Sequence, residues 1–322
     1  MRNLLSIFHF SLLTPIKIMS FFENRDDVIK VTENIYLIRG PNNSRFPFCN
    51  CFLITGKATV LIDAGIGVDK INEIDKEKRI DILVISHSHP DHILGWHVLE
   101  DRHILLPKET PDSVKDMELL GQRFTGSADK GAYWVKIFRD GMGMHPMRDP
   151  NGRFGNGSVL KTGGTQIEAI HTPGHLDDHY CFFDRQTGTI LTSDIDFAPF
   201  GPWYGNPECD IEVFRDSVKK IMALPYKQIC SSHNQPINGD ATANFEAFLN
   251  SFTRQREAVL TACHTPRTLE QILALSPFYR NRLPDKVLQK IFEAPMIMKN
   301  LSLLIRDGLV KEKWGQYRHA DL

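Results

Sequence analysis

The chain has 322 residues, a net charge of −1 and a charged fraction of 24%. This length allows one large domain or two smaller ones. The near-neutral charge gives no sign of a broad basic surface for nucleic acid, but it does not exclude a local basic patch. The six cysteines are scattered along the chain, which predicts reduced thiols and a cytoplasmic protein.

Residues 1–19 have an early arginine and an apolar middle, as in a signal peptide. His9, Pro15 and Lys17 interrupt the apolar run, and no small-residue cleavage site follows. The run is too short and broken to cross a bilayer. We therefore expect residues 1–20 to be a disordered or loosely packed extension, with Met19 as an alternative start and no membrane as a partner.

Alternating and β-rich segments follow at 28–40 and 49–65, with turn residues at 55–57 that predict a hairpin. Residues 71–80 have the pattern of a charged amphipathic helix, and the continuous apolar run 81–86 predicts a buried strand. The stretch "HSHPDH" then lies at the carboxyl end of that strand, where ligands and catalytic groups concentrate in α/β proteins.

The pattern of strands that end in polar residues repeats further along the chain. A short strand is expected at 103–107, followed by an insertion at 108–158 with little regular structure, which we expect to cover a site or to move. The later elements are strands within 165–175 and 178–196, a helix at 211–225 and a strand at 227–233.

From about residue 240 the expected elements are helical. Helices are predicted at 243–263, 265–276 and 294–308, and a two-stranded ribbon at 309–320. Three helices followed by a β-ribbon are typical of a winged-helix module. We therefore expect an α/β catalytic domain at 21–240 and a small, mainly helical domain at 241–322.

Side chains that bind metals recur at four of these strand ends. Burying so many imidazoles and carboxylates without partners is costly, and a bound cation removes that cost. His87 and His89, two apart in an extended segment, can converge on one ion, while Asp91 and His92 can reach a second. Imidazole together with carboxylate favours zinc or non-haem iron over magnesium or calcium. The residues are His87, His89, Asp91, His92, His175, Asp194 and His233.

Five motifs in this order resemble those of the metallo-β-lactamase superfamily: "LIDAG" (61–65), "HSHPDH" (87–92), "HTPGH" (171–175), "SDID" (193–196) and "CSSHN" (230–234). The resemblance implies a four-layer αββα sandwich, and the helical tail is similar to the subgroup with a C-terminal winged-helix domain; hydroxyacylglutathione hydrolases are also similar. Ser232 and Asn234 depart from the glycines that usually flank the last histidine of the family.

The resemblance also implies the role of each ligand. His87, His89 and His175 would hold one metal, Asp91, His92 and His233 the other, and Asp194 would bridge them. The implied cofactors are two divalent ions, zinc in the first place, with iron and manganese open. Asp63 would orient a ligand imidazole, and Asp91 would act in catalysis by guiding a metal-bridging hydroxide and moving its proton.

The expected activity is hydrolysis of a small thioester or related ester, with His179, Phe197, Trp203 and Tyr204 in the substrate pocket. A single-stranded RNA endoribonuclease is one alternative, with RNA as the partner, and a mononuclear iron persulfide dioxygenase is another. A binding protein with a degenerate site is disfavoured because all seven ligand positions are filled. A homodimer is left open.

Overall fold

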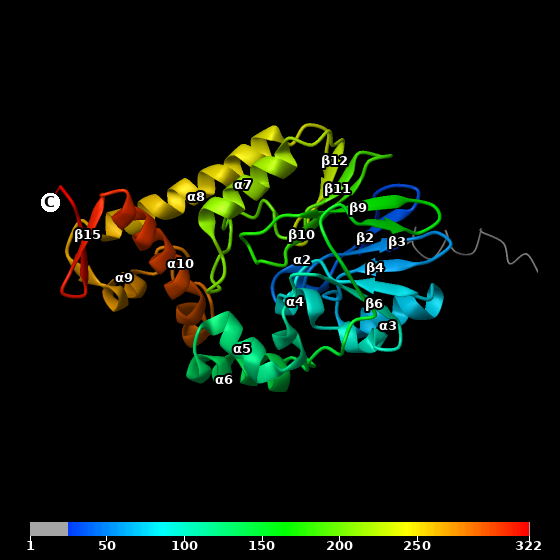
Figure 1. Ribbon diagram of the computed structural model, residues 1–322, viewed down its shortest axis with the longest axis horizontal. Coiled ribbons are helices and arrows are strands. Elements are labelled where there is room, and N and C mark those ends of the chain that lie inside the picture. Colours follow the sequence, from blue (N-terminus) through cyan, green and yellow to red (C-terminus); the bar gives the residue numbers. More distant parts are fainter. Residues whose placement is uncertain (1–24, 322) are drawn as a thin grey trace, which may run out of the picture.

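Two β-sheets pack face to face in the computed structural model, which describes residues 25–321 (Figure 1). The predicted extension at 1–20 lies outside the described residues. Within them the first sheet has seven strands in chain order: β1 (Val28–Lys30), β2 (Ile35–Ile38), β3 (Cys51–Ile54), β4 (Val60–Ile62), β5 (Ile82–Val84), β6 (His103–Pro107) and β7 (Gly152–Phe154).

The second sheet has six strands in the described part of the chain, in the order β13-β12-β11-β10-β9-β8. Because β10 is antiparallel to both β9 and β11, and β12 is parallel to β11, the carboxyl ends of β9, β11 and β12 point the same way. The strands are β8 (Val159–Lys161), β9 (Gln166–His171), β10 (Tyr180–Asp184), β11 (Thr189–Leu191), β12 (Gln228–Cys230) and β13 (Ile237–Asn238).

Strand β3 shows why these segments are apolar on both faces. Phe52 and Ile54 belong to the core between the sheets, together with Phe182 of β10. Leu53 points to the opposite face and joins the core that includes Ile71 of helix α3 (Val68–Glu77). All four residues of β3 are therefore buried, as expected for a strand covered on both sides.

Helices cover the outer face of each sheet. Helix α3 lies along the first sheet, and α7 (Ile211–Met222) and α8 (Thr242–Ala262) lie along the second (Figure 1). Helix α7 begins at Asp210, whose carboxylate accepts hydrogen bonds from two backbone N–H groups, and it buries an apolar stripe that includes Phe214 and Val218. The expected four-layer αββα arrangement is confirmed.

The insertion at 108–158 is more regular than the sequence predicts. It contains α5 (Met117–Thr125) and α6 (Ala128–Val135), which begin at the N-caps Asp116 and Ser127. A Cβ atom at Gly121 would lie 2.7 Å from the carbonyl oxygen of Gly131, so the helices approach closely where neither residue has a side chain. The prediction of little regular structure is wrong because both helices are short and draw their stability from this mutual packing.

The C-terminal region builds a core of its own. Helices α9 (Leu269–Leu275) and α10 (Lys286–Arg306) pack against the end of α8, and β14 (Arg267–Thr268), β15 (Val310–Lys313) and β16 (Gln316–His319) form a small sheet. A capping box begins α9: Thr268 Oγ1 accepts from Gln271 N–H, and Gln271 Oε1 accepts from Thr268 N–H. This region lies beside α5 and α6 (Figure 1).

Two further expectations concern thiols and membranes. All six cysteines are buried and free of disulfides. Within residues 25–321, none of the helices combines the length and the apolar composition that a bilayer crossing requires.

Gly65, which follows β4, lets this strand end approach the short helix α4 (Pro90–Ile93). A Cβ atom at Gly65 would lie 1.7 Å from the carbonyl oxygen of Asp91. We expect Gly65→Ala to lower the free energy of unfolding by about 3 kcal/mol, because backbone must move to admit the methyl group. Gly141→Ala is the control, since the nearest atom there is 3.9 Å away. Denaturant unfolding that shows equal effects for both variants would contradict this account.

Candidate metal centre

The predicted ligand side chains all follow the carboxyl ends of strands and meet at one edge of the sandwich. His87 and His89 come after β5, His175 comes after β9, and Asp194 and His233 come after β11 and β12. Asp91 and His92 lie in the first turn of α4, which starts at Pro90 and is therefore directly continuous with the histidine pair. Residues more than a hundred positions apart are brought into contact in this way.

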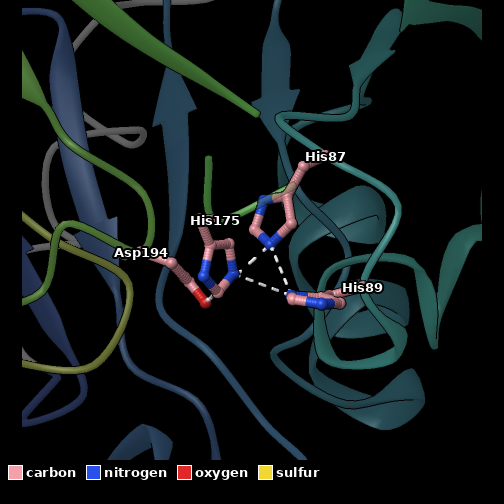
Figure 2. A group of neighbouring side chains, drawn as sticks. All are labelled: His87, His89, His175 and Asp194. Atoms are coloured by element: carbon pink, nitrogen blue, oxygen red, sulfur yellow. Dashed lines mark hydrogen bonds and ion pairs between the residues drawn. The ribbon is translucent and has the colours of Figure 1, made fainter. Parts of the chain in front are cut away.

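The first group consists of His87, His89, His175 and Asp194, whose ligand atoms lie within 4.8 Å of one another. His89 Nδ1 lies 3.1 Å from His87 Nε2 and 2.8 Å from His175 Nε2. Asp194 Oδ2 is 3.2 Å from His175 Nε2. Figure 2 shows the three rings turning these nitrogens toward a common centre.

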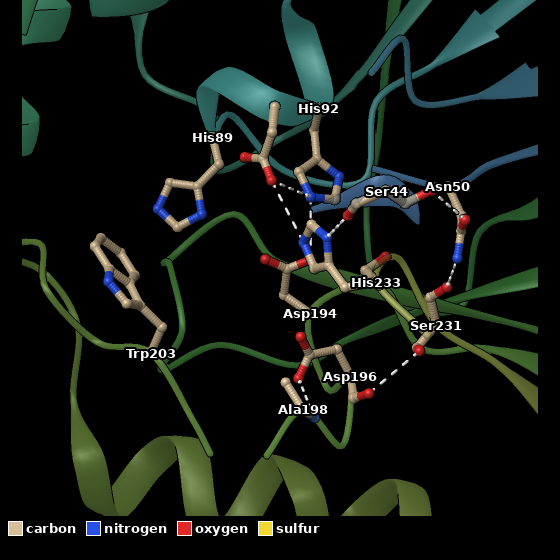
Figure 3. A network of polar contacts seen from close by, with 12 residues as sticks. Ser44, Asn50, His89, His92, Asp194, Asp196, Ala198, Trp203, Ser231 and His233 are labelled. Carbon is tan, nitrogen blue, oxygen red and sulfur yellow. Dashed lines mark hydrogen bonds and ion pairs between the residues drawn. The ribbon is translucent and has the colours of Figure 1, made fainter. Parts of the chain in front are cut away.

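The second group consists of Asp91, His92, His233 and the same Asp194. Asp194 Oδ1 lies 3.0 Å from His92 Nε2 and 3.6 Å from His233 Nε2, and Asp91 Oδ2 lies 3.4 Å from His233 Nε2 (Figure 3). Asp194 therefore turns one carboxylate oxygen toward each group.

Each imidazole is oriented through the nitrogen that faces away from the cluster. His92 Nδ1 lies 2.8 Å from Asp63 Oδ2, and this carboxylate also accepts hydrogen bonds from the N–H and the hydroxyl of Ser86. The role of Asp63 in orienting a metal-bound imidazole stays a prediction, and these are the contacts that it would use. The other partners are Ser86 Oγ for His87, the Asn206 amide for His89, the carbonyl of Trp203 for His175 and the carbonyl of Ser44 for His233.

Four of these partners were not expected from the sequence: Ser86, Ser44, Trp203 and Asn206. Trp203 and Ser44 act through their backbone carbonyls, which any residue would offer, and so no sequence signal marks them. Asn206 lies in a loop and carries no motif.

The unpaired atoms of the cluster fit a cation. Among the described residues, the buried His92 Nε2 and Asp194 Oδ1 have no hydrogen-bond partner, although they lie 3.0 Å apart. Three ring nitrogens of the first group lie within 2.8–3.1 Å of a neighbour, where their lone pairs repel unless a proton or a cation lies between them. A donor set of imidazole and carboxylate fits a divalent transition metal.

The protonation of the two groups differs in the absence of metal. Burial lowers the pKa of His87 and His89 well below the usual imidazole value, and neighbouring histidines lower it further. Burial also opposes the charging of His92 and His233, but nearby carboxylates, foremost that of Asp194, outweigh it and raise the pKa of both well above the usual value. His87 and His89 are therefore neutral, whereas His92 and His233 carry protons.

A cavity of about 520 Å³ opens over both groups. Its floor includes His89, Asp91, His175, Asp194 and His233. Its walls are mainly apolar and come from three parts of the chain: Phe124 and Trp134 from the insertion, Trp203 and its neighbours from the loop after Asp194, and Tyr279, Leu283 and Phe292 from the C-terminal region.

The C-terminal wall is held by a buried carboxylate. Glu293 of α10 is fully buried and accepts hydrogen bonds from the backbone N–H groups of Phe278 and Tyr279. Tyr279 Oη in turn accepts from Trp203 Nε1 at 2.8 Å. Trp203 thus contacts both the C-terminal wall and, through its carbonyl, the ligand His175.

Of the four expected pocket residues, Trp203 lines the cavity, and the structure places the others elsewhere. His179 is buried behind Asp194, whose backbone N–H donates to His179 Nε2, and burial lowers its pKa to about 3. Phe197 packs edge-on against Phe245 of α8. Tyr204 is fully buried and donates its hydroxyl to Gln255 Oε1. A bend at Phe197, with φ of 57°, turns this ring toward α8.

Comparison with known families settles the affiliation. The family model of the Metallo-beta-lactamase superfamily matches residues 45–233, which is more than half of the chain and includes every ligand residue. The chain belongs to the metallo-beta-lactamase superfamily. The recognition made from the five motifs is confirmed.

Several curated proteins resemble this superfamily member at low identity. A lactamase-like protein, ptaB, of Pestalotiopsis fici is 25% identical over 52% of this chain and 47% of its own length, so the chain spans about half of that relative. The thioesterase pkgB of Emericella nidulans is 26% identical over 69% of this chain and 55% of its own length. An atrochrysone carboxyl ACP thioesterase of Emericella nidulans is 22% identical over 88% of this chain and 82% of its own length.

The fold is also similar to that of a solved superfamily protein. The metallo-beta-lactamase family protein TTHA1429 of Thermus thermophilus matches with a TM-score of 0.69 and 19% identity, covering 90% of this chain and 99% of that one. The match therefore extends over the C-terminal helical region as well as the sandwich.

Asp63→Asn tests the orientation of His92. The substitution removes the carboxylate that lies against His92 Nδ1 and that accepts hydrogen bonds from the N–H and the hydroxyl of Ser86. We therefore expect metal affinity to fall about 10–100-fold, as measured by titration against a competing chelator. Asp184→Asn is a matched control, because Asp184 is equally buried and accepts local hydrogen bonds far from the ligands. Equal losses in both variants would show a general loss of stability.

Metal binding should also release protons. Since His92 and His233 are protonated in the metal-free protein, a divalent ion must displace their protons, and affinity should fall as the pH is lowered. Calorimetric titrations at neutral pH in buffers of different ionisation enthalpy measure this release. We expect His92→Gln to release fewer protons than the unaltered chain. Binding heats that do not depend on the buffer would contradict the protonation described here.

Proposed function

We propose that the protein is a dinuclear metal-dependent hydrolase of small acyl thioesters or related esters. The observation that carries the proposal is the position of the two ligand groups at the floor of a largely apolar cavity of about 520 Å³. Cavities of this size and character are typical of sites for small molecules. Two of the relatives, pkgB and the atrochrysone carboxyl ACP protein, are named thioesterases, which supports the same substrate class.

His87, His89 and His175 would hold one ion and Asp91, His92 and His233 the other, with Asp194 shared between them. Zinc is the first choice for this donor set, and iron and manganese remain alternatives. A pair of divalent ions supplies an activated water at neutral pH and polarises the carbonyl oxygen that is attacked.

Asp91 is the proposed catalytic residue of the chain itself. Its carboxylate lines the cavity floor and lies in the turn that presents His92. In this position an Asp91 oxygen can orient the attacking water, accept its proton and deliver that proton to the leaving thiolate sulfur. The aromatic walls exclude other water from the reaction, which strengthens the electrostatic contacts at the floor.

The cavity walls would bind the acyl part of the substrate. Trp203 lies next to the ligands, with its ring 5.1 Å from that of His89, and Phe46, Phe124 and Phe292 extend the apolar surface outward. Because Phe292 and Tyr279 belong to the C-terminal region, this region acts in the proposal as a wall of the substrate site.

The same lining weighs against a nuclease. Proteins that hold single-stranded nucleic acid use a positively charged groove along the phosphates. Among the described residues that line the cavity, Arg45 is the one lysine or arginine, whereas Asp91, Asp194 and Asp196 add negative charge. A thioester with an apolar acyl group fits this surface better.

The test is the rate of thiol release from a panel of acyl thioesters by the metal-loaded protein, followed with a thiol reagent. We expect hydrolysis of substrates with apolar acyl groups, and we expect Asp91→Asn to lower kcat by about 100-fold or more. Asp69→Asn on the exposed start of α3 is the control and should leave the rate unchanged.

Three results would overturn the proposal. The first is cleavage of single-stranded RNA, steeply dependent on salt, without cleavage of any thioester. The second is a single iron ion for each chain in elemental analysis, together with oxidation of a persulfide. The third is one bound ion where the proposal requires two.

A further inference from the structure

Asn50 is a buried residue of the loop before β3 that belongs to neither ligand group. We propose that it is a positioning residue for the second group: it locks the Ser44 carbonyl in the place from which that carbonyl orients His233. The inference rests on the proposed two-metal function and assigns a role to a residue outside the ligand motifs.

The side chain of Asn50 ties together two loops that meet at His233 (Figure 3). Its amide nitrogen donates to the carbonyls of Ser231 at 2.8 Å and Asn234 at 3.0 Å, and its amide oxygen accepts from Ser44 Oγ at 2.6 Å. The backbone N–H of Asn50 donates to the carbonyl of Ser232 at 2.6 Å. Asn50 is 2% exposed, so water cannot take over these contacts without a rearrangement.

The partners of Asn50 lie on both sides of His233 in the sequence. The loop after β12 is therefore fixed immediately before and after the ligand, where the family usually has glycines. Asn234 is fixed further, since its amide nitrogen donates to the carbonyl of Asp196 at 2.6 Å. These contacts fix the backbone and the Cβ of His233, but they do not fix the rotation of its imidazole ring.

Ser44 supplies that constraint. Its carbonyl oxygen lies 2.6 Å from His233 Nδ1, and a hydrogen bond from this nitrogen leaves Nε2 free to face Asp91 and Asp194. Ser44 has a left-handed backbone with φ of 56°, as do the two residues before it. Such a turn is costly for residues other than glycine and persists where the surroundings hold it. The hydroxyl of Ser44 donates to Asn50 Oδ1 and accepts from the N–H of Gly40. These two hydrogen bonds hold the turn in its left-handed conformation.

The effect should be confined to one group. His87, His89 and His175 are oriented by Ser86, Asn206 and Trp203, and none of these three contacts Asn50 in a hydrogen bond of the described residues. His92 is oriented by Asp63. Loss of the Asn50 amide should therefore loosen His233 and leave the first group intact.

The experiment is a zinc titration of Asn50→Ala against a competing chelator, with elemental analysis. We expect one of the two equivalents to bind about 10–100-fold more weakly and the other to bind as before. In a His87→Ala background, where the second group remains, Asn50→Ala should weaken binding by the same factor. In a His233→Ala background it should have no further effect, because the contact it supports is already lost.

Asn206→Ala is the matched comparison, because it removes an amide that lies 3.1 Å from His89 Nε2 in the first group. We expect the opposite pattern: Asn206→Ala should weaken zinc binding in the His233→Ala background, where the first group remains, and not in the His87→Ala background. If Asn50→Ala does not fold, Ser44→Ala carries the test, since it removes the hydroxyl contact to Asn50 and keeps the carbonyl.

A lower melting temperature of Asn50→Ala with unchanged affinity for both equivalents would overturn the inference, as would equal weakening of both groups. The proposed function is tested separately by the count of ions in the unaltered chain. If that count is one, the hydrogen bond between His233 Nδ1 and the Ser44 carbonyl still decides the inference: in nitrogen NMR of the imidazoles, the Nδ1–H proton of His233 should exchange slowly with water in the unaltered chain and faster in Asn50→Ala. An unchanged His233 signal would overturn it.

Discussion

Close contact between buried ring nitrogens and carboxylates is the constraint on which this molecule depends. His89 Nδ1 lies within about 3 Å of two other imidazoles, and Asp194 Oδ1 is buried without a hydrogen bond among the described residues. A cation compensates such a cluster, and the protein must hold the ligands in place before the cation arrives. The parallel ends of β9, β11 and β12 and the start of α4 do so from the two sheets.

The surrounding chain forms two layers around this cluster, one in contact with the imidazoles and one farther out. Close to it, Asp63, Ser44 and the carbonyl of Trp203 fix the rings from behind. Farther out, the insertion and the C-terminal region enclose the space above the ligands with aromatic side chains. Trp203 belongs to both levels, because its carbonyl faces His175 and its indole N–H donates to Tyr279. Trp203 therefore links the C-terminal wall of the cavity to His175, a proposed ligand.

Sequence periodicity located most of the elements that carry ligands. The strands expected at 81–86 and 227–233 contain β5 and β12, and the strand expected at 103–107 matches the structure residue by residue. The helices of the insertion were missed, because Gly121 and Gly131 read as breaks in a sequence but serve as the contact surface between α5 and α6. His179 and Tyr204 were expected in the pocket from their place beside the motifs, yet both point away from it into buried hydrogen bonds.

The sequence by itself determined the family and the order of the strands that lead into the site, and it predicts the ligand residues, because metal chemistry restricts those positions to a few residue types at regular spacing. Apart from Trp203 and Asp63, which the sequence predicts, the tertiary structure alone decided which side chains wall the cavity and which groups lie against the imidazoles. Phe46, Phe124 and Phe292 come from three distant segments, and the Ser44 carbonyl that faces His233 is a backbone atom. Apolar walls and backbone acceptors can be supplied by many residues, so only their positions in space reveal what they do.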